Sequence, residues 1–254
     1  MNVFITGASS GIGAALAAEF ARRGACVGLV ARRRDALDAL AAQLPGTHHT
    51  YAVDVTDRDA LIGAAQDFGR ASGGADIVVA NAGISVGVMT EHYEDLAVFA
   101  DVLNTNVLAL AHTFHPFIAP MRARGRGTLA GIASVAGIRG LPGSEAYCAS
   151  KAAAISYCES LRVDLARDGI RVVTIAPGFV RTPLTAKNPY RMPFLMAPDA
   201  FARRAVDAIV AGASYRVIPW QMAIVARLLR ALPNWAFDRL MANRPRKPRR
   251  TEPA

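Results

Sequence analysis

The chain has 254 residues, 52% of them hydrophobic, and carries 29 Lys and Arg against 20 Asp and Glu, a formal net charge of +9. This size and apolar content exclude a largely disordered protein and predict a single domain with a large core, because no linker divides the chain. The positive charge does not indicate nucleic-acid binding, since the arginines are scattered over predicted helices without an aromatic–basic platform or zinc-ligand spacing.

The three cysteines, Cys26, Cys148 and Cys158, lack the spacing of metal ligands, and the chain begins with the apolar residues 3–5 rather than with a charged leader. We therefore expect a reduced, cytoplasmic protein that binds no metal. The adjacent His48 and His49 are expected in a solvated loop, because no further ligands accompany them.

The first predicted unit is a strand at residues 3–5, a glycine-rich turn and a helix from about Ile12. In the turn, Gly7 permits a tight bend, Gly11 lets the backbone approach a pyrophosphate, and Gly13 allows close packing of helix on strand. The pyrophosphate would face the amides and the positive dipole of the helix N-terminus. A flexible surface turn also explains the glycines taken alone, but their place between strand and helix favours a cofactor loop.

The second predicted strand, residues 26–31, ends at Ala31 and is followed by Arg32, Arg33 and Arg34. An NAD-binding protein would place an acidic residue at this strand end to bind the ribose 2′-hydroxyl. A guanidinium suits a 2′-phosphate, which a carboxylate would repel, so the sequence favours NADP over NAD. Arg34 can equally well be an exposed basic residue at the start of the next helix. This alternative interpretation does not extend to Arg32.

Tyr147 and Lys151 lie four positions apart in a predicted helix that runs to about residue 169, so their side chains share one helical face. A free phenol has a pKa of about 10, and lowering it by about three units with a nearby ammonium takes about 4 kcal/mol. Such a pair also occurs on ordinary amphipathic helices. Two separate motifs accompany it here: the glycine-rich turn, and Ser134 at the end of a predicted strand, residues 127–134.

In their order and spacing, these motifs closely resemble those of the short-chain dehydrogenase/reductase family, over about residues 3–182. Strands alternating with helices along the chain predict an α/β, Rossmann-like, doubly wound parallel sheet of about seven strands in a single domain. The resemblance implies that Ser134 binds a carbonyl oxygen and that Tyr147 exchanges a proton with it. It also implies that Lys151 lowers the pKa of Tyr147 and binds the nicotinamide ribose.

The resemblance implies a role for Asn106 as well, in the predicted helical region between residues 93 and 121: a proton relay through a water next to the lysine. Asn104 is the alternative, but the residues that follow Asn106 fit the family better. Cofactor contacts are implied for Gly7, Ser9, Ser10, Gly11, Ile12, Gly13, Arg32, Arg33, Asp54, Val55, Asn81, Ala82, Gly83, Tyr147, Lys151, Pro177, Gly178, Val180 and Thr182. Of these, Asp54 and Val55 end a strand predicted at residues 51–55.

The last part of the chain departs from the shortest family members. Residues 184–198 correspond to a substrate lid, whose Met and Phe side chains suit an apolar substrate. After the predicted domain, residues 1–219, come a helical extension at 220–243 and a basic tail at 244–254 that is expected to be disordered. The extension is too short and too interrupted by arginines to span a membrane. It is expected to pack on the pocket or in an oligomer, with a membrane surface as the alternative.

The predicted function is hydride transfer between NADP(H) and a ketone, aldehyde or secondary alcohol, a small and apolar molecule. The alternative is a nonenzymatic NADP-binding regulator, or a membrane-surface protein, that keeps the fold. By resemblance alone we expect a homodimer or homotetramer, formed through the helices that carry Asn106 and Tyr147. The predicted location is cytoplasmic, with peripheral membrane contact through the C-terminal helices as an option.

Overall fold

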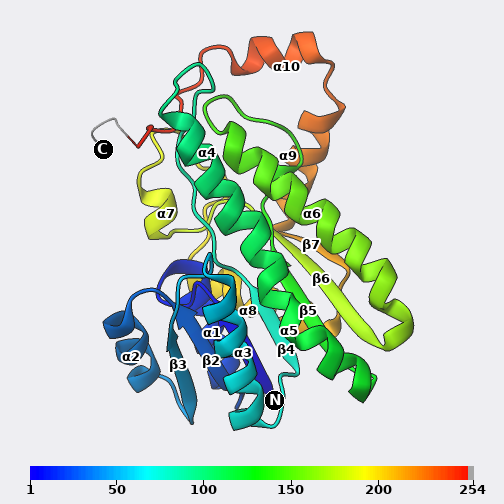
Figure 1. Ribbon diagram of the computed structural model, residues 1–254. Helices are drawn as coiled ribbons and strands as arrows, with labels where there is room; N and C mark the ends of the chain where they lie inside the picture. Colours follow the sequence, from blue (N-terminus) through cyan, green and yellow to red (C-terminus); the bar gives the residue numbers. More distant parts are fainter. Residues whose placement is uncertain (251–254) are drawn as a thin grey trace.

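Seven parallel strands form the centre of the fold, in the order β3-β2-β1-β4-β5-β6-β7 (Figure 1). The structure is a computed structural model that describes residues 1–250. The strands are β1 (Asn2–Thr6), β2 (Cys26–Ala31), β3 (His48–Ala52), β4 (Ile77–Ala80), β5 (Gly127–Ile132), β6 (Ile170–Pro177) and β7 (Tyr215–Ile218). The chain winds outward from β1 in one direction and from β4 in the other, so the predicted doubly wound α/β sheet is confirmed.

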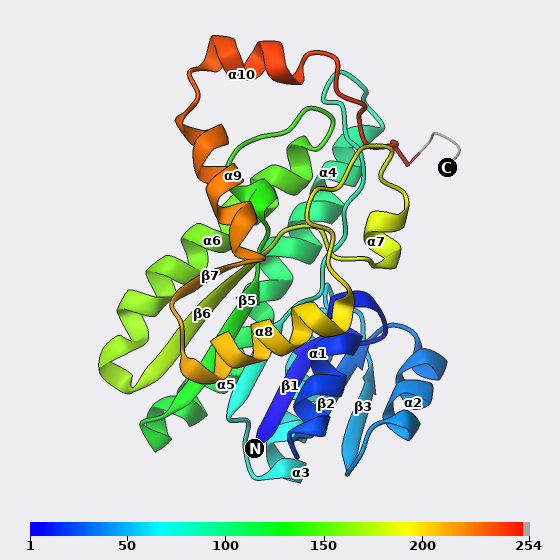
Figure 2. The ribbon, with the colours of Figure 1, turned by 180° about the vertical axis from the view of Figure 1, so that it is seen from behind.

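Helices cover both faces of the sheet, as a comparison of Figures 1 and 2 shows. One face carries α1 (Gly11–Arg22), α2 (Arg34–Gln43) and α8 (Pro198–Ala211), and the other carries α3 (Arg58–Ser72), α5 (Ala109–Arg124) and α6 (Glu145–Leu165). The inner strands are apolar in nearly every position because both of their faces are buried. Each face therefore has its own apolar core.

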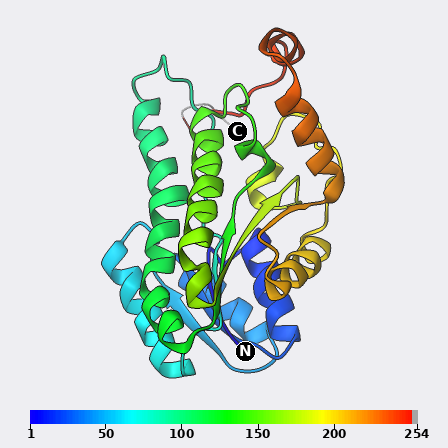
Figure 3. The same ribbon diagram turned by 90° about the vertical axis from the view of Figure 1, so that its right-hand side faces the viewer.

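A long helical rod runs along the second face, where α4 (Asp95–Leu103), a π-helical turn (Asn104–Leu108) and α5 follow one another without a break (Figure 3). By length and composition this rod could cross a membrane. Its side chains Phe114, Phe117 and Met121, however, are buried in the core against the sheet. The rod thus acts as a core helix of the α/β domain.

The strand predicted at residues 51–55 lies three residues earlier, at His48–Ala52, so the prediction of a loop at His48 and His49 is wrong. His48 pairs with Val27, and its ring accepts a hydrogen bond from the Val27 amide at 3.2 Å. The ring of His49 packs edge-on against Phe68. Because β3 is an edge strand, it tolerates polar side chains that hide its apolar pattern.

The C-terminal extension forms α9 (Trp220–Ala231) and α10 (Asn234–Met241), beyond the edge strand β7. Residues 184–198, which are predicted to form a substrate lid, include most of α7 (Pro183–Ala186) and the loop that follows it. The expected disorder of the tail does not hold for residues 244–250, which lie against the domain with Lys247 buried. The acidic side chains that hold this segment come from α4 and the residue before it. Residues 251–254 of the predicted tail lie outside the described residues.

Candidate active site

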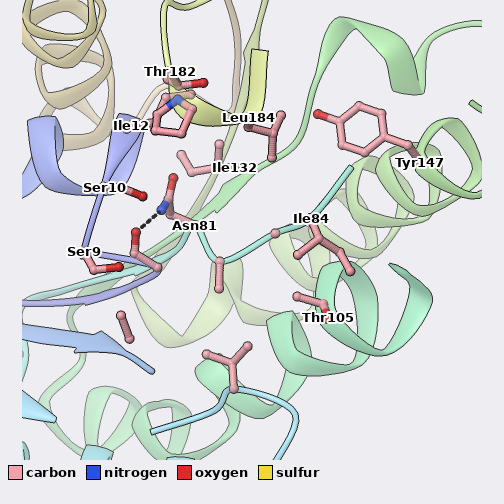
Figure 4. Close-up of a pocket in the computed structure, with 18 of the residues that line it drawn as sticks. Ser9, Ser10, Ile12, Asn81, Ile84, Thr105, Ile132, Tyr147, Thr182 and Leu184 are labelled. Carbon is pink, nitrogen blue, oxygen red and sulfur yellow. Dashed lines mark hydrogen bonds between the residues drawn. The ribbon is translucent and has the colours of Figure 1, made fainter. Parts of the chain in front are cut away.

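A cavity of about 720 Å³ opens at the carboxyl ends of β1, β2, β4, β5 and β6. It lies where the winding of the sheet reverses, between β1 and β4, which is the usual ligand position in doubly wound folds. Every predicted site residue except Asn106 lines it. Figure 4 shows side chains from both sheet halves that converge on this space, with the phenol oxygen of Tyr147 directed into it.

The loop between β1 and α1 is held tightly against the loop after β4. The side-chain nitrogen of Asn81 donates to the main-chain oxygen of Thr6, at 3.0 Å, and to that of Gly7, at 3.2 Å. The second of these bonds is the dashed line in Figure 4. Gly7 has a φ of 69°, a left-handed conformation that favours glycine. A Cβ on Gly13 would lie 2.1 Å from the Gly7 oxygen. The N-terminus of α1 therefore faces the cavity at a fixed position, as an anion-binding site requires.

Two arginines stand at the far end of this cavity. The Arg33 guanidinium lies 3.3 Å from the Ser9 hydroxyl, which places it over the glycine-rich loop. Arg32 approaches Asp54 at 3.8 Å, and its side chain is 73% exposed. An exposed ion pair of this length contributes little free energy, so the Arg32 guanidinium remains available to a ligand.

The three predicted catalytic side chains Ser134, Tyr147 and Lys151 line the same side of the cavity. Ser134 follows β5 directly, whereas Tyr147 and Lys151 project from the first turns of α6. The Lys151 ammonium donates to the Ile132 main-chain oxygen at 2.8 Å and lies 5.9 Å from the centre of the Tyr147 ring. Strand β5 and helix α6 thus fix an alcohol, a phenol and an amine within one site.

The pKa values of this group differ from the sequence-based expectation. Burial raises the pKa of Tyr147 to about 12, and a hydrogen bond with Ser134 only partly opposes that effect. Burial lowers the pKa of Lys151 to about 8. The predicted lowering of the Tyr147 pKa by Lys151 is therefore not seen: withdrawal from water outweighs attraction to an ammonium that points toward a main-chain oxygen. The phenol is accordingly protonated at neutral pH.

Asn106 lies outside the cavity lining but builds its wall. It is 1% exposed within the π-helical turn, and its side-chain oxygen accepts from the Ile84 amide at 2.8 Å. Its nitrogen donates to the Ile84 oxygen at 3.0 Å and to the Ser150 hydroxyl at 2.9 Å. All strong hydrogen-bonding directions of the side chain but one are therefore used. Asn106 positions Ile84, a cavity residue, against α6.

Replacing Asn106 by Ala is expected to destabilise the fold by about 3 kcal/mol, because the buried Ile84 amide and oxygen lose their partners. Urea unfolding followed by circular dichroism measures this change. Asn104→Ala is the matched control on the same turn, where the side chain is exposed; it should shift the free energy of unfolding by less than about 0.5 kcal/mol. Equal effects of the two changes would contradict the supporting role of Asn106.

Several cavity residues were missed by the sequence reading because they carry no motif. They are Ala31, Val53, Thr56, Ile84, Val86, Asp101, Thr105, Ile132, Ala133, Pro183 and Arg250. Most immediately precede or follow a motif residue, so adjacency to a strand end could have suggested them. Arg250 is the exception, since it comes from the tail. Within residues 1–250, no cluster of three or more His, Cys, Asp or Glu side chains could hold a metal ion.

Comparisons with known proteins agree with this geometry. Residues 1–192 match the family described as short chain dehydrogenase. An uncharacterized oxidoreductase of Myxococcus xanthus is 42% identical over 240 residues, which cover 93% of this chain and 94% of the relative. The solved structure of L-sorbose reductase from Gluconobacter frateurii, complexed with NADPH and L-sorbose, is 28% identical with a TM-score of 0.77, covering 85% of this chain and 94% of that one. A 3-ketoacyl-(acyl-carrier-protein) reductase from Brucella melitensis, complexed with NADH, is 26% identical with a TM-score of 0.77, covering 85% and 96%.

Proposed function

This chain belongs to the short-chain dehydrogenase/reductase family of oxidoreductases, and we propose that it reduces a ketone or aldehyde with NADPH, or oxidises the corresponding alcohol with NADP. The observation that carries the proposal is the presence of Ser134, Tyr147 and Lys151 in the same cavity as the glycine-rich loop. Nucleotide and carbonyl substrate would thus meet in one space. The substrate is a small molecule, as is general for this family.

The residues of the cavity fit a dinucleotide. The main-chain amides at the start of α1 suit a pyrophosphate, and because Gly7 and Gly13 have no side chains, the space in front of these amides stays open. When bound, NADPH would supply the hydride. The exposed Arg32, next to Ala31 rather than to a carboxylate, supports NADP in preference to NAD.

The chain's own residues would act on the carbonyl oxygen. Ser134 and Tyr147 donate hydrogen bonds to it, which stabilises the negative charge that develops during reduction. The protonated Tyr147 then gives its proton to that oxygen as a general acid. Lys151 would hold the ribose hydroxyls of the bound nucleotide through its ammonium. Because the Asn106 side chain is engaged with Ile84 and Ser150, we assign any relay of protons at this turn to its main-chain groups.

A reductase screen with a panel of ketones and aldehydes, in which the loss of NADPH absorbance is followed, tests the proposal. NADPH binding is measured in parallel by fluorescence. Turnover that depends on Tyr147 supports an oxidoreductase of carbonyl groups. Tight NADPH binding without turnover of any carbonyl would instead favour the nonenzymatic regulator.

Replacing Arg32 by Ala is expected to weaken NADPH binding about 10- to 100-fold, because a charge-assisted contact with the 2′-phosphate is lost. NADH lacks that phosphate, so its dissociation constant should change by less than about twofold. Fluorescence titration of both nucleotides measures the two constants. Arg34→Ala is the control, since Arg34 contacts Thr50 of β3 and Asp38 of α2 and does not line the cavity. Equal losses for NADPH and NADH would refute the phosphate contact.

The outer surface of the C-terminal helices carries exposed apolar side chains that could contact another molecule without interfering with catalysis. Trp220, Ile224 and Leu228 form an exposed stripe along α9, and Trp235 is 74% exposed on α10. The opposite face of α9 packs on the domain through Met222 and Ala226. We propose that this stripe serves as the contact surface for oligomer packing, with an anionic membrane surface as the alternative occupant. Cytoplasmic location remains part of the proposal.

A further inference from the structure

The C-terminal segment, residues 244–250, lies near α4 (Figure 1) and contributes Arg250 to the lining of the active-site cavity. The Gly87 amide donates to the Pro248 oxygen at 3.0 Å. The Arg249 guanidinium binds the buried Asp95 at 2.8 Å and Glu94 at 2.7 Å. Arg250 pairs with Asp101 at 2.8 Å and itself lines the cavity. Ion pairs and a main-chain hydrogen bond therefore hold the segment next to the cavity, and its residue Arg250 reaches the lining.

Lys247 stands in the middle of this segment and is only 8% exposed. Its ammonium donates to the Ser85 hydroxyl at 2.7 Å and lies 5.9 Å from the centre of the Tyr147 ring. Ser85 is flanked by the cavity residues Ile84 and Val86. The tail thus brings a second buried ammonium, besides that of Lys151, to the proton-donating phenol.

Among residues 1–250, no carboxylate pairs with the Lys247 ammonium. Its neighbours Arg249 and Arg250 each form ion pairs, but no Asp or Glu within residues 1–250 lies within 4.0 Å of the Lys247 ammonium. A buried ammonium that lacks a counter-ion is costly in free energy. Burial indeed lowers the pKa of Lys247 to about 8. An ammonium has three N–H donors, and within the described chain one of them is used, so the others are free to bind an anionic group.

We propose that Lys247 binds the anionic group of the substrate, so that the enzyme acts on oxo acids rather than on wholly apolar carbonyl compounds. This inference rests on the proposed function and adds the substrate class. The carbonyl would lie at Ser134 and Tyr147 in the cavity. The carboxylate would extend past the lining residues Ile84 and Val86 toward the Lys247 ammonium and the Ser85 hydroxyl, which lie next to the cavity lining.

The test compares each member of a series of oxo acids of increasing chain length with its methyl ester, which keeps the carbonyl and removes the charge. Lys247→Met keeps the length and apolar stem of the side chain. We expect it to lower kcat/KM for the preferred oxo acid about 10- to 100-fold, mainly through KM, because a charged contact is lost. For the ester, kcat/KM should change by less than about twofold. Lys247→Arg should restore much of the activity toward the acid.

Arg244→Met is the matched control, since Arg244 is exposed on the same segment; it should leave both substrates unaffected. Equal losses for acid and ester in Lys247→Met would overturn the inference, since they would indicate a general effect on the site. So would a wild-type preference for the esters throughout the series. In either case Tyr147-dependent turnover of the esters would leave the proposed function standing. An absence of wild-type turnover of every carbonyl, with NADPH bound, would overturn both.

Discussion

Replacing Tyr147 by Phe is expected to lower the rate of carbonyl reduction about 10²- to 10⁴-fold, the range typical for loss of a general acid. The change removes one hydroxyl that donates both a hydrogen bond and a proton, while the ring and its packing on α6 remain. NADPH binding should therefore change by less than about twofold. Single-turnover reduction and fluorescence titration separate the two quantities.

Tyr157→Phe is the matched control for this substitution. Tyr157 lies on the same helix, but its ring stacks on Phe114 with the ring centres 6.5 Å apart, and it does not line the cavity. Removing its hydroxyl should leave turnover unchanged. Wild-type turnover in the Tyr147 variant would show that another group supplies the proton, and the assignment of the site would fail.

The pH dependence of the wild-type enzyme should follow the same phenol. Because burial raises the pKa of Tyr147 to about 12, the acid form persists through neutral pH and is lost only as the pH rises through that value. Reduction needs the protonated phenol, so its rate should stay level near neutrality and then fall in alkaline solution. Alcohol oxidation needs the phenolate and should gain with pH. A reduction rate that increases with pH would contradict the role of Tyr147 as an acid.

The parts of the fold with strong local patterns were predictable from the sequence. The unit formed by β1, the glycine-rich turn and α1 combines an apolar run, three spaced glycines and a helical period, and the structure places it as expected. Local patterns also predicted the meeting of Ser134, Tyr147 and Lys151. One of these residues lies at a strand end and the other two share a helical face, and the structure brings all three to one cavity. The edge strand β3 gave a weaker signal, because His48 and Thr50 interrupt its alternation.

The tail and the electrostatics of the site depend on distant contacts that no local pattern reveals. A run of Arg, Lys and Pro at the end of a chain is typical of a solvated segment. Only the tertiary fold brings Asp95 to Arg249, 154 positions away, and seats Lys247 beside Tyr147. Likewise, the spacing of Tyr147 and Lys151 predicts their proximity but not their burial, and it is burial that sets the direction of both pKa shifts.

Replacing Gly13 by Ala is expected to destabilise the protein by about 3 kcal/mol and to weaken NADPH binding at least about 10-fold. The new Cβ would lie 2.1 Å from the Gly7 oxygen and 2.5 Å from the Asn81 amide nitrogen. The first of these atoms belongs to the main chain, so the clash is relieved only if α1 and the cofactor loop move apart. Such a movement would also displace the amides that face the pyrophosphate. Urea unfolding and nucleotide titration measure the two effects.

The same substitution at Gly63 is the control that distinguishes the steric clash of a new Cβ from the other effects of replacing glycine by alanine. Gly63 lies in α3, and a Cβ there would meet no atom within 4 Å. Gly63→Ala should stabilise the protein by about 0.5–1 kcal/mol, because alanine favours the helix, and should leave NADPH binding intact. If Gly13→Ala bound NADPH as the wild type does, the contact between Gly13 of α1 and Gly7 would not position the cofactor loop. Loss of binding in that variant alone would tie nucleotide affinity to the close approach of these two elements.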